Sequence, residues 1–217
     1  MIPWFRVPPL DGSLVRLEQL SLSHAQDLAL AAEQDRSSYD FTLVPRAEGV
    51  GEYLAAQFER TEQGLIPFAQ IRQTDGRAVG CTAYLDPRYW PGRERVALRA
   101  VEIGFTWLAA SAHGSGINAE AKLLLMRHAF ETLRVARVDF KTDARNKRSR
   151  RALEALGVTF EGVLRSWSTS WAPGEDHLLR DSAMYSVTAS EWPTVQSLLA
   201  QRLAKYRASG TPIEIVP

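Results

Sequence analysis

Hydrophobic and polar residues recur along the chain with periods that predict short strands and helices in turn. Near the N-terminus, Val15 and Leu17 alternate with charged residues, a period of two that indicates a half-buried strand. Residues 23–33 then place apolar side chains at helical spacing, with Ser23 as the expected N-cap. The chain therefore begins with a strand and a short helix, and a loop rich in polar residues follows.

Two strand-like runs, residues 68–71 and 79–85, lie on either side of a turn signal. The turn contains Asp75-Gly76, a pair that favours tight hairpins. We therefore expect the two strands to be antiparallel. A polar loop over residues 89–92 should follow them.

The second half of the chain alternates further between strand and helix patterns. β-Branched and aromatic residues at 100–108 predict a central strand, and the apolar stretch 117–133 predicts a helix buried on more than one side. A strand over residues 137–142 and a helix over residues 149–156 come next, and Gly157 is expected to close that helix.

Two late strands and a last helix complete the pattern. Residues 164–171 and 178–187 predict strands around a turn, and Ser190 is expected to cap a helix that begins near Glu191. The order of elements predicts an α+β (mixed α/β) fold, with a mixed sheet and helices on its faces.

Composition changes this picture mainly by exclusion. With 217 residues, 45% of them apolar and 24% charged, residues 1–217 are expected to form a single domain. Lys and Arg number 26 against 25 Asp and Glu, so the net charge of +1 gives no general attraction to nucleic acid or an anionic membrane. The single cysteine, Cys81, excludes an internal disulfide and a cysteine-built metal cluster. Since no leader or membrane-length apolar run is evident, we expect a cytoplasmic protein without a metal, a membrane or a nucleic-acid partner.

A strand that runs through a glycine-containing turn into a helix is the first candidate for chemistry. Gly114 and Gly116 stand in that turn and can adopt positive φ, which brings backbone N–H groups and a helix N-terminus to one point. Such a point suits a phosphate or pyrophosphate. The alternative is a simple connecting turn, and Ala119 stands where a dinucleotide fingerprint would have its third glycine.

A basic segment, residues 145–151, is the second candidate. Asn146 could cap the following helix, with the basic residues merely solvated. Alternatively, Asn146 binds an amide-bearing ligand while some of the neighbouring cations, Arg148 among them, meet a phosphate.

These segments together resemble a known family. Residues 102–108 (EIGFTWL), residues 114–121 (GSGINAEA), Asn146-x-x-Ser149, Leu153-Glu154-x-x-Gly157 and Glu161-Gly162 are similar to motifs of the GNAT superfamily of acyl-CoA N-acyltransferases. The similarity is greatest to its RimJ/RimL-like branch, whose named members acetylate the N-termini of ribosomal proteins. It extends over about residues 14–192.

The resemblance implies a fold and a cosubstrate, acetyl-CoA. The family sheet is mixed and mostly antiparallel, and two neighbouring parallel strands, here residues 100–108 and 137–142, splay apart around the pantetheine arm. Backbone groups near Leu108 and Ala109 would pair with pantetheine. The pyrophosphate and the rest of the coenzyme would contact His113, Gly114, Ser115, Gly116, Ile117, Asn118, Asn146, Arg148 and Ser149.

The resemblance also implies catalytic roles. Glu102 is the candidate general base, although a strand-edge ion pair is an equal alternative, and the Leu108 N–H would stabilise the oxyanion. Ser149 would protonate the departing thiolate, because Leu153 occupies the place of the family's tyrosine; Tyr185 is a weaker candidate. Cys81 is expected to be a small core residue, so the amine should attack the thioester directly.

One departure from the family pattern concerns the glycine turn, because Ser111 stands where the family commonly has Gln or Arg. Together with Leu153, it leaves a catalytically weak or inactive acyl-CoA-binding regulatory protein as an alternative to an N-acetyltransferase. A nucleic-acid-binding module would rest on residues 145–151 alone.

The acceptor would be a primary amine, either a protein N-terminus or a small metabolite or antibiotic. Its pocket is expected from residues 23–41, Tyr89-Trp90, Trp167 and Trp171. Residues 191–217, a C-terminal helix and tail, could cover the sheet or mediate a homodimer.

Overall fold

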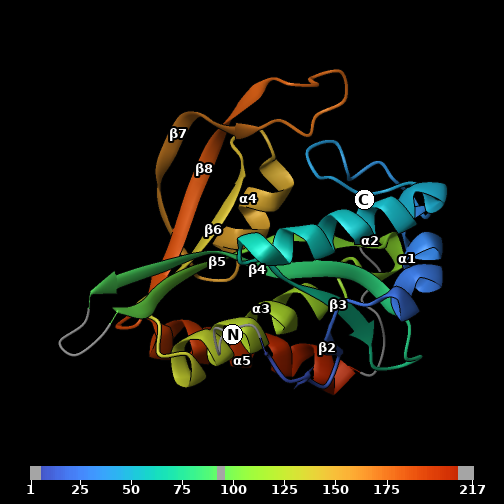
Figure 1. The fold of residues 1–217 in the computed structure, drawn as a ribbon. Helices are drawn as coiled ribbons and strands as arrows, with labels where there is room; N and C mark the ends of the chain where they lie inside the picture. The colour runs from blue at the N-terminus through green and yellow to red at the C-terminus, as the bar shows by residue number, and fades with distance from the viewer. Residues whose placement is uncertain (1–5, 92–95, 210–217) are drawn as a thin grey trace.

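The structure, a computed structural model, describes residues 6–91 and 96–209. Its centre is an eight-stranded sheet in the order β1-β2-β3-β4-β5-β6-β8-β7, in which β5 and β6 are parallel and the other neighbours antiparallel (Figure 1). The strands are β1 Leu10–Asp11, β2 Val15–Gln19, β3 Ile66–Arg72, β4 Ala78–Pro91, β5 Val96–Leu108, β6 Arg137–Asp143, β7 Thr159–Thr169 and β8 Leu179–Thr188. The α-helices are α1 Ala25–Ala32, α2 Val50–Glu59, α3 Ile117–Arg127, α4 Lys147–Glu154 and α5 Trp192–Ser209.

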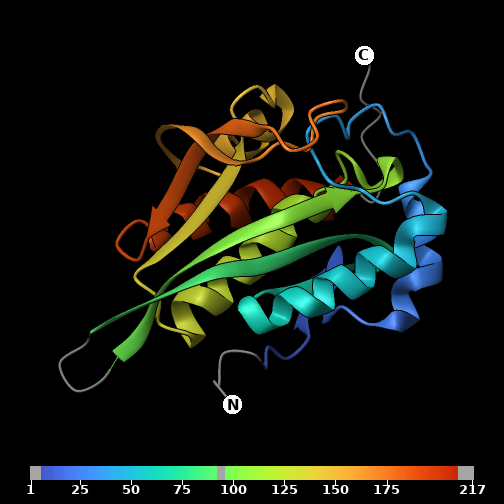
Figure 2. The same cartoon turned by 45° about the horizontal axis from the view of Figure 1, so that its top comes forward.

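Helices cover both faces of this sheet. Figures 1 and 2 show α1 and α2 on one face, and α3 and α5 on the other. Two side-chain contacts fix the faces: the Tyr84 hydroxyl of β4 donates to the Leu125 carbonyl of α3, and Trp107 Nε1 of β5 donates to Tyr53 Oη of α2 at 3.2 Å. The mixed, mostly antiparallel sheet with helices on both faces confirms the expected α+β fold class.

The two parallel strands separate along their length. They pair only at Ala100↔Arg137, Val101↔Val138 and Glu102↔Asp139. Beyond Glu102, β5 continues along β4 as far as Leu108, whereas β6 continues along β8 as far as Asp143. The sheet therefore opens into a wedge between β5 and β6, as the family resemblance implied.

The hairpin between β4 and β5 is longer than expected. Residues 89–91 were expected in a loop, but β4 runs to Pro91, and Tyr89 and Trp90 pair with Leu98 and Ala97 of β5. Register shifts near Arg88 keep the two strands paired past the point where the sequence pattern breaks, because a bulge absorbs the extra residue. Gly92 lies outside the described residues.

Helix α2 is an element that the sequence pattern did not reveal. Its buried residues, Val50, Tyr53, Leu54 and Gln57, follow helical spacing, but a glutamine in the buried set and Gly51 in the first turn hide the period. The start of α1 also differs, because Ser23 lies inside a 3-10 turn, Leu22–His24, whose N-cap is Ser21.

The remaining helix ends shift by a few residues. Helix α3 stops at Arg127 and continues as a π-helical turn, His128–Thr132. Helix α4 begins two residues before the expected start, and Gly157 adopts φ 80°, as its expected place beyond the helix end requires.

The last helix covers the sheet, the first of the two alternatives for this segment. Helix α5 packs against α3 and β8. At its start the Glu191 carboxylate accepts the Thr188 N–H, whereas the expected cap, Ser190, bonds only the Thr188 hydroxyl. The tail, residues 210–217, lies outside the described residues.

Two glycines make a matched test of the packing of β4 against β5. A Cβ on Gly80 would lie 2.1 Å from the Trp107 carbonyl oxygen, whereas a Cβ on Gly51 in α2 meets nothing within 4 Å. Gly80→Ala is expected to lower the free energy of unfolding by ~1–3 kcal/mol, as overpacking does. Gly51→Ala should raise it by ~0.5 kcal/mol because alanine favours the helix. Urea titration measures both, and equal effects of the two variants would contradict this packing.

Candidate active site

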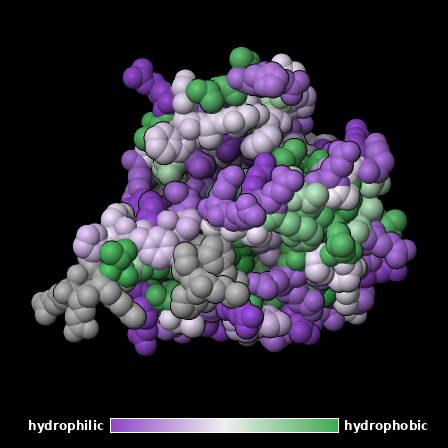
Figure 3. Space-filling model, in the orientation of Figure 1, coloured by the Kyte–Doolittle hydropathy of each residue, from purple (hydrophilic) through white to green (hydrophobic). Residues whose placement is uncertain are grey.

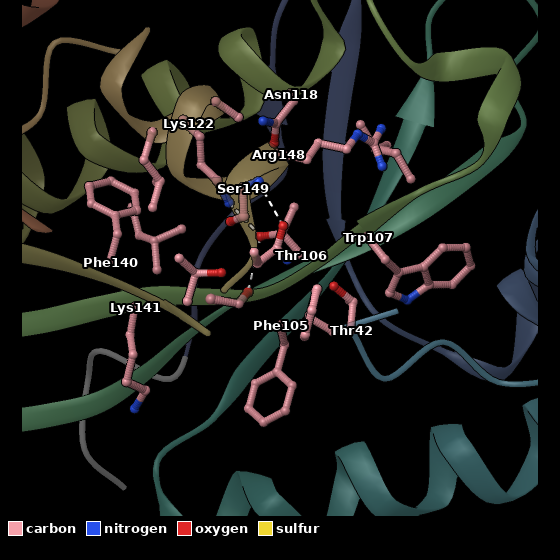
Figure 4. Close-up of a pocket in the computed structure, with 18 of the residues that line it drawn as sticks. Thr42, Phe105, Thr106, Trp107, Asn118, Lys122, Phe140, Lys141, Arg148 and Ser149 are labelled. Atoms are coloured by element: carbon pink, nitrogen blue, oxygen red, sulfur yellow. Dashed lines mark hydrogen bonds between the residues drawn. The ribbon is translucent and has the colours of Figure 1, made fainter. Parts of the chain in front are cut away.

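A cavity of about 520 Å³ occupies the wedge between the splayed strands. In Figure 3 the surface is hollowed between the β7–β8 arm and the body of the sheet, with hydrophilic residues around the hollow. The lining comes from β5, β6, β8, the N-terminal halves of α3 and α4, the segment 38–43 and the end of α5. Figure 4 shows how several of these side chains converge.

A bulge shapes the β5 wall of the cavity. Ala83 pairs with Gly104 and Cys81 with Trp107, so Phe105 and Thr106 together stand opposite a single residue of β4. Phe105 adopts φ 48°, in the left-handed region. The bulge keeps Thr106 on the α3 face, where it lines the cavity.

The backbone of Leu108 faces the wedge. The Ala109 N–H donates to the Val79 carbonyl at 2.8 Å, so Gly80 and Leu108 form a non-hydrogen-bonded pair whose own backbone groups point away from each other. The Leu108 carbonyl accepts the Tyr39 hydroxyl and His113 Nε2, each at 2.9 Å. Of the two residues expected to pair with pantetheine, Leu108 therefore presents its backbone to the cavity, whereas the Ala109 amide belongs to the sheet.

The glycine turn has the backbone conformation that its sequence suggested. Gly114 and Gly116 adopt φ 69° and 85°, and α3 begins at the next residue. His113, Gly114, Gly116 and Asn118 line the cavity; Ser115 and Ile117 do not. Asn118 Oδ1 is buried and has no hydrogen-bond partner among the described residues, so it can accept an N–H from a bound molecule.

The expected cap of α4 is present. Asn146 Oδ1 accepts the Ser149 N–H at 2.9 Å, and both residues line the cavity. Ser149 therefore stands at the first turn of α4, opposite the bulge of β5 (Figure 4).

Most of the basic segment serves the fold. Arg145 binds Asp143 and Glu175, and Arg150 binds the Tyr185 hydroxyl at 3.0 Å. The exposed Arg148 lines the cavity, and its charge helps burial to lower the pKa of His113. Of residues 145–151, the cavity thus receives Arg148 as its cation.

Glu102 lies in the cavity at the point where β5 and β6 part. It is 4% exposed, and its Oε2 lies 3.1 Å from Lys141 Nζ. Burial raises the pKa of Glu102 above the ordinary 4.5, and the lysine charge opposes that shift. The ion pair is therefore present, and the carboxyl group also has the raised basicity that a general base needs.

Two candidate groups are committed elsewhere. Burial raises the pKa of Cys81 to about 12, so its thiol stays protonated at neutral pH. The Tyr185 hydroxyl donates to Glu154 at 3.1 Å and accepts from Arg150, and Tyr185 is fully buried. Cys81 is a core residue, as expected, and neither group lines the cavity.

The expected acceptor pocket is only partly assembled. Ser38, Tyr39, Phe41 and Trp171 line the cavity. Tyr89, Trp90 and Trp167 do not, because the first two lie on the extended hairpin and the third is 55% exposed on β7.

Four cavity residues were missed by the sequence analysis: Lys122, Arg180, Arg202 and Tyr206. Lys122 had a recognisable signal, since it is a lone cation in an apolar helical stretch, one turn beyond Asn118. Arg202 and Tyr206 had none, because only the packing of α5 brings them near the glycine turn; a Cβ on Gly116 would lie 3.0 Å from Tyr206 Cγ.

Comparison with known proteins agrees with this fold and cavity. The family model of the acetyltransferase (GNAT) domain matches residues 15–159. A curated relative, "Probable N-acetyltransferase YjcK" of Bacillus subtilis (strain 168), is 26% identical over 175 residues, which cover 77% of this chain and 93% of the relative.

Solved structures agree as well. One from T. thermophilus, described as an acetyltransferase, is 37% identical with a TM-score of 0.74, over 91% of this chain and 98% of that one. RimL, described as a ribosomal L7/L12 alpha-N-protein acetyltransferase in complex with coenzyme A, is 18% identical with a TM-score of 0.63, over 83% and 98% of the two chains, and shows the fold alone.

The fold and cavity define an acyl-transferring enzyme of the acetyl-CoA-dependent type. The chain belongs to the GNAT acetyltransferase family and is an N-acetyltransferase. Within the described residues, no helix is long and apolar enough to span a membrane.

Proposed function

We propose that this chain transfers the acetyl group of acetyl-CoA to a primary α-amine of a peptide or protein, by direct attack within the wedge between β5 and β6. The observation that carries the proposal is the loss of pairing after Glu102 and Asp139, which leaves a cavity with the β5 bulge on one wall and the glycine turn at its end. We propose residues 1–217 as one domain, with residues 191–217 as its C-terminal helix and tail.

The chain's own groups supply the binding chemistry in this proposal. Backbone N–H groups of residues 113–118, at the start of α3, hold the diphosphate with help from Arg148. Asn118 Oδ1, buried and without a hydrogen-bond partner among the described residues, accepts an amide N–H of the pantetheine arm. Asn146 and Ser149 form the opposite side of the same groove.

Three groups would act on the reacting atoms. The Leu108 N–H stabilises the oxyanion, because the backbone of this residue points into the wedge. Glu102 takes the proton of the attacking amine through a water molecule, and the Ser149 hydroxyl donates a hydrogen bond to the leaving sulfur.

The charge of the cavity favours a weakly basic acceptor. Within the part of the chain that the structure describes, its lining carries a single carboxylate, Glu102, against the cations Lys122, Lys141, Arg148, Arg180 and Arg202. Such a surface disfavours a protonated amine. Neutralising a lysine side chain, with a reference pKa near 10.4, costs about 3 kcal/mol more than neutralising an α-amine with a pKa near 8. We therefore propose an α-amine, as in the RimJ/RimL-like branch.

A paired-peptide assay tests the acceptor. One peptide has a free N-terminus and arginine in place of lysine, and its partner has a blocked N-terminus and one internal lysine. With acetyl-CoA in excess, the free N-terminus should gain acetyl at least tenfold faster at pH 7.5, measured by mass spectrometry. Faster labelling of the internal lysine would contradict the α-amine. Labelling of small polyamines or aminoglycosides alone would favour a small-molecule acceptor instead.

A further inference from the structure

A buried lysine lies directly against the β5 bulge. Lys122 projects from α3 into the cavity and is 4% exposed. Its Nζ donates to Thr106 Oγ1 at 2.5 Å and to Thr82 Oγ1 at 3.0 Å (Figure 4). An ammonium buried in this way costs free energy, so its retention in the floor of the cavity calls for a reason.

Lys122 has no counter-ion within the described part of the chain. No carboxylate oxygen of residues 6–91 or 96–209 lies within 4 Å of its Nζ, and its one nearby acidic neighbour on α3, Glu120, faces away and binds the N–H groups of Leu14 and Val15. Burial alone lowers the pKa of Lys122 from 10.5 to about 7, so both protonation states are available near neutral pH.

The charged and titratable groups that share the cavity come from every element around it. None of them contributes to the shift of the Lys122 pKa, whose only cause is burial. They are Tyr39 of the segment 38–43, Glu102 of β5, His113 of the glycine turn, Lys141 of β6, Arg148 of α4, Arg180 of β8, and Arg202 and Tyr206 of α5.

The hydroxyl of Thr106 is placed to pass a proton on. Thr106 Oγ1 accepts from Lys122, so its own proton is free to be donated; within the protein the acceptors in reach are Thr82 Oγ1 at 2.9 Å and the Gly104 carbonyl at 3.3 Å. Thr106 also lines the cavity on the strand that carries Leu108. Ser149, across the cavity, has no such ammonium bonded to its hydroxyl among the hydrogen bonds of the described residues.

We propose that Lys122 is the source of the proton that neutralises the leaving thiolate, and that the Thr106 hydroxyl relays it. The bond between the acceptor nitrogen and the acetyl carbon forms, and the carbon–sulfur bond breaks with its electron pair left on sulfur. The sulfur takes a proton from Thr106, which takes one from the Lys122 ammonium. The proton lost by the attacking nitrogen goes through water to Glu102. Exchange with solvent then restores Lys122 and Glu102, so no net proton is consumed beyond the thiol formed.

This assignment explains how the site can work without the family's tyrosine. Leu153 cannot donate a proton, and a serine hydroxyl is too weak an acid to supply one unaided. In this inference Ser149 orients the sulfur, whereas Lys122 supplies the proton. Because Lys122 acts through Thr106, it is a positioning and proton-supplying residue that does not itself touch the substrate.

The test is the pH profile of kcat for three variants beside the wild type. The wild type should lose kcat on the alkaline side of its optimum as Lys122 deprotonates. Lys122→Met should lower kcat about 10²-fold and abolish this alkaline limb, with the Kd for coenzyme A unchanged. Lys122→Arg keeps the charge but cannot release a proton at accessible pH, so it should be as slow as Lys122→Met. Lys205→Met, an exposed lysine of α5, is the control and should leave the profile unchanged.

A second variant protects the test against misfolding of Lys122→Met. Thr106→Val preserves shape but removes the relay, and it should show the same loss of kcat and of the alkaline limb. Ser149→Ala should instead lower kcat with the alkaline limb retained.

Wild-type kcat in Lys122→Arg, or an alkaline limb that persists in both Lys122→Arg and Thr106→Val, would overturn the assignment. The inference rests on the proposed acetyl transfer, and the two fail differently. A wild-type protein that acetylates no amine contradicts the proposed function, whereas an active wild type with unaltered variants contradicts only the role of Lys122.

Discussion

Replacement of Glu102 by glutamine is expected to lower kcat/KM about 10²- to 10⁴-fold, the usual contribution of a positioned general base. Glutamine keeps the size of the side chain but cannot take a proton from the attacking amine. Glu48→Gln, on an exposed position, is the matched control and should retain wild-type activity. Steady-state kinetics with acetyl-CoA and a free-N-terminus peptide measure the difference.

The pH dependence of the same reaction follows from the burial of Glu102. Its pKa is raised above 4.5, so the carboxylate becomes protonated, and inactive as a base, at a higher pH than an exposed glutamate would. Activity should therefore fall as the pH drops, with a midpoint above 4.5. Removal of the partner charge in Lys141→Met should move this acid limb to still higher pH. An unchanged acid limb in both Glu102→Gln and Lys141→Met would show that another group is the base.

Replacement of Gly116 by alanine is expected to weaken the binding of coenzyme A at least tenfold. Gly116 adopts φ 85°, and a Cβ there would lie 2.8 Å from Leu14 Cδ1 and 3.0 Å from Tyr206 Cγ. The turn must shift to accommodate the methyl group, so the N–H groups at the start of α3 no longer converge on the diphosphate. Isothermal titration calorimetry with coenzyme A measures the loss.

Gly174→Ala separates backbone strain from site geometry. Gly174 adopts φ 77° in the turn between β7 and β8, and a Cβ there meets nothing within 4 Å. Both alanines pay about 1–2 kcal/mol for the left-handed conformation, but only Gly116 belongs to the glycine turn. Gly174→Ala should lower stability and leave the Kd for coenzyme A unchanged. Equal Kd values for the two variants would place the diphosphate elsewhere.

Local patterns predicted the parts of the fold that depend on local chemistry. The Asp75-Gly76 turn lies between antiparallel strands, Asn146 caps α4, and the glycines before α3 have positive φ, because turn and cap geometry is written in a few adjacent residues. Helix α2 escaped detection because Gln57 occupies a buried position that the pattern counts as polar.

Tertiary contacts decide the rest. The β4 strand extends to Pro91 only because β5 is there to pair with it, and Arg202 and Tyr206 reach the cavity only because α5 packs against α3. The roles of Glu102 and Lys122 depend on burial, which a single sequence does not report. The family motif located the cavity, but it did not disclose the lysine beneath the bulge.

The most direct measurement follows the thiol and the acetyl group together. Acetyl-CoA labelled in the acetyl group is mixed with the protein, with and without a free-N-terminus peptide, and free thiol and labelled peptide are quantified over time. The account predicts that thiol release requires the amine and equals the acetylated peptide mole for mole. Thiol release without an N-acetylated product, or none with any amine although coenzyme A binds, would contradict it.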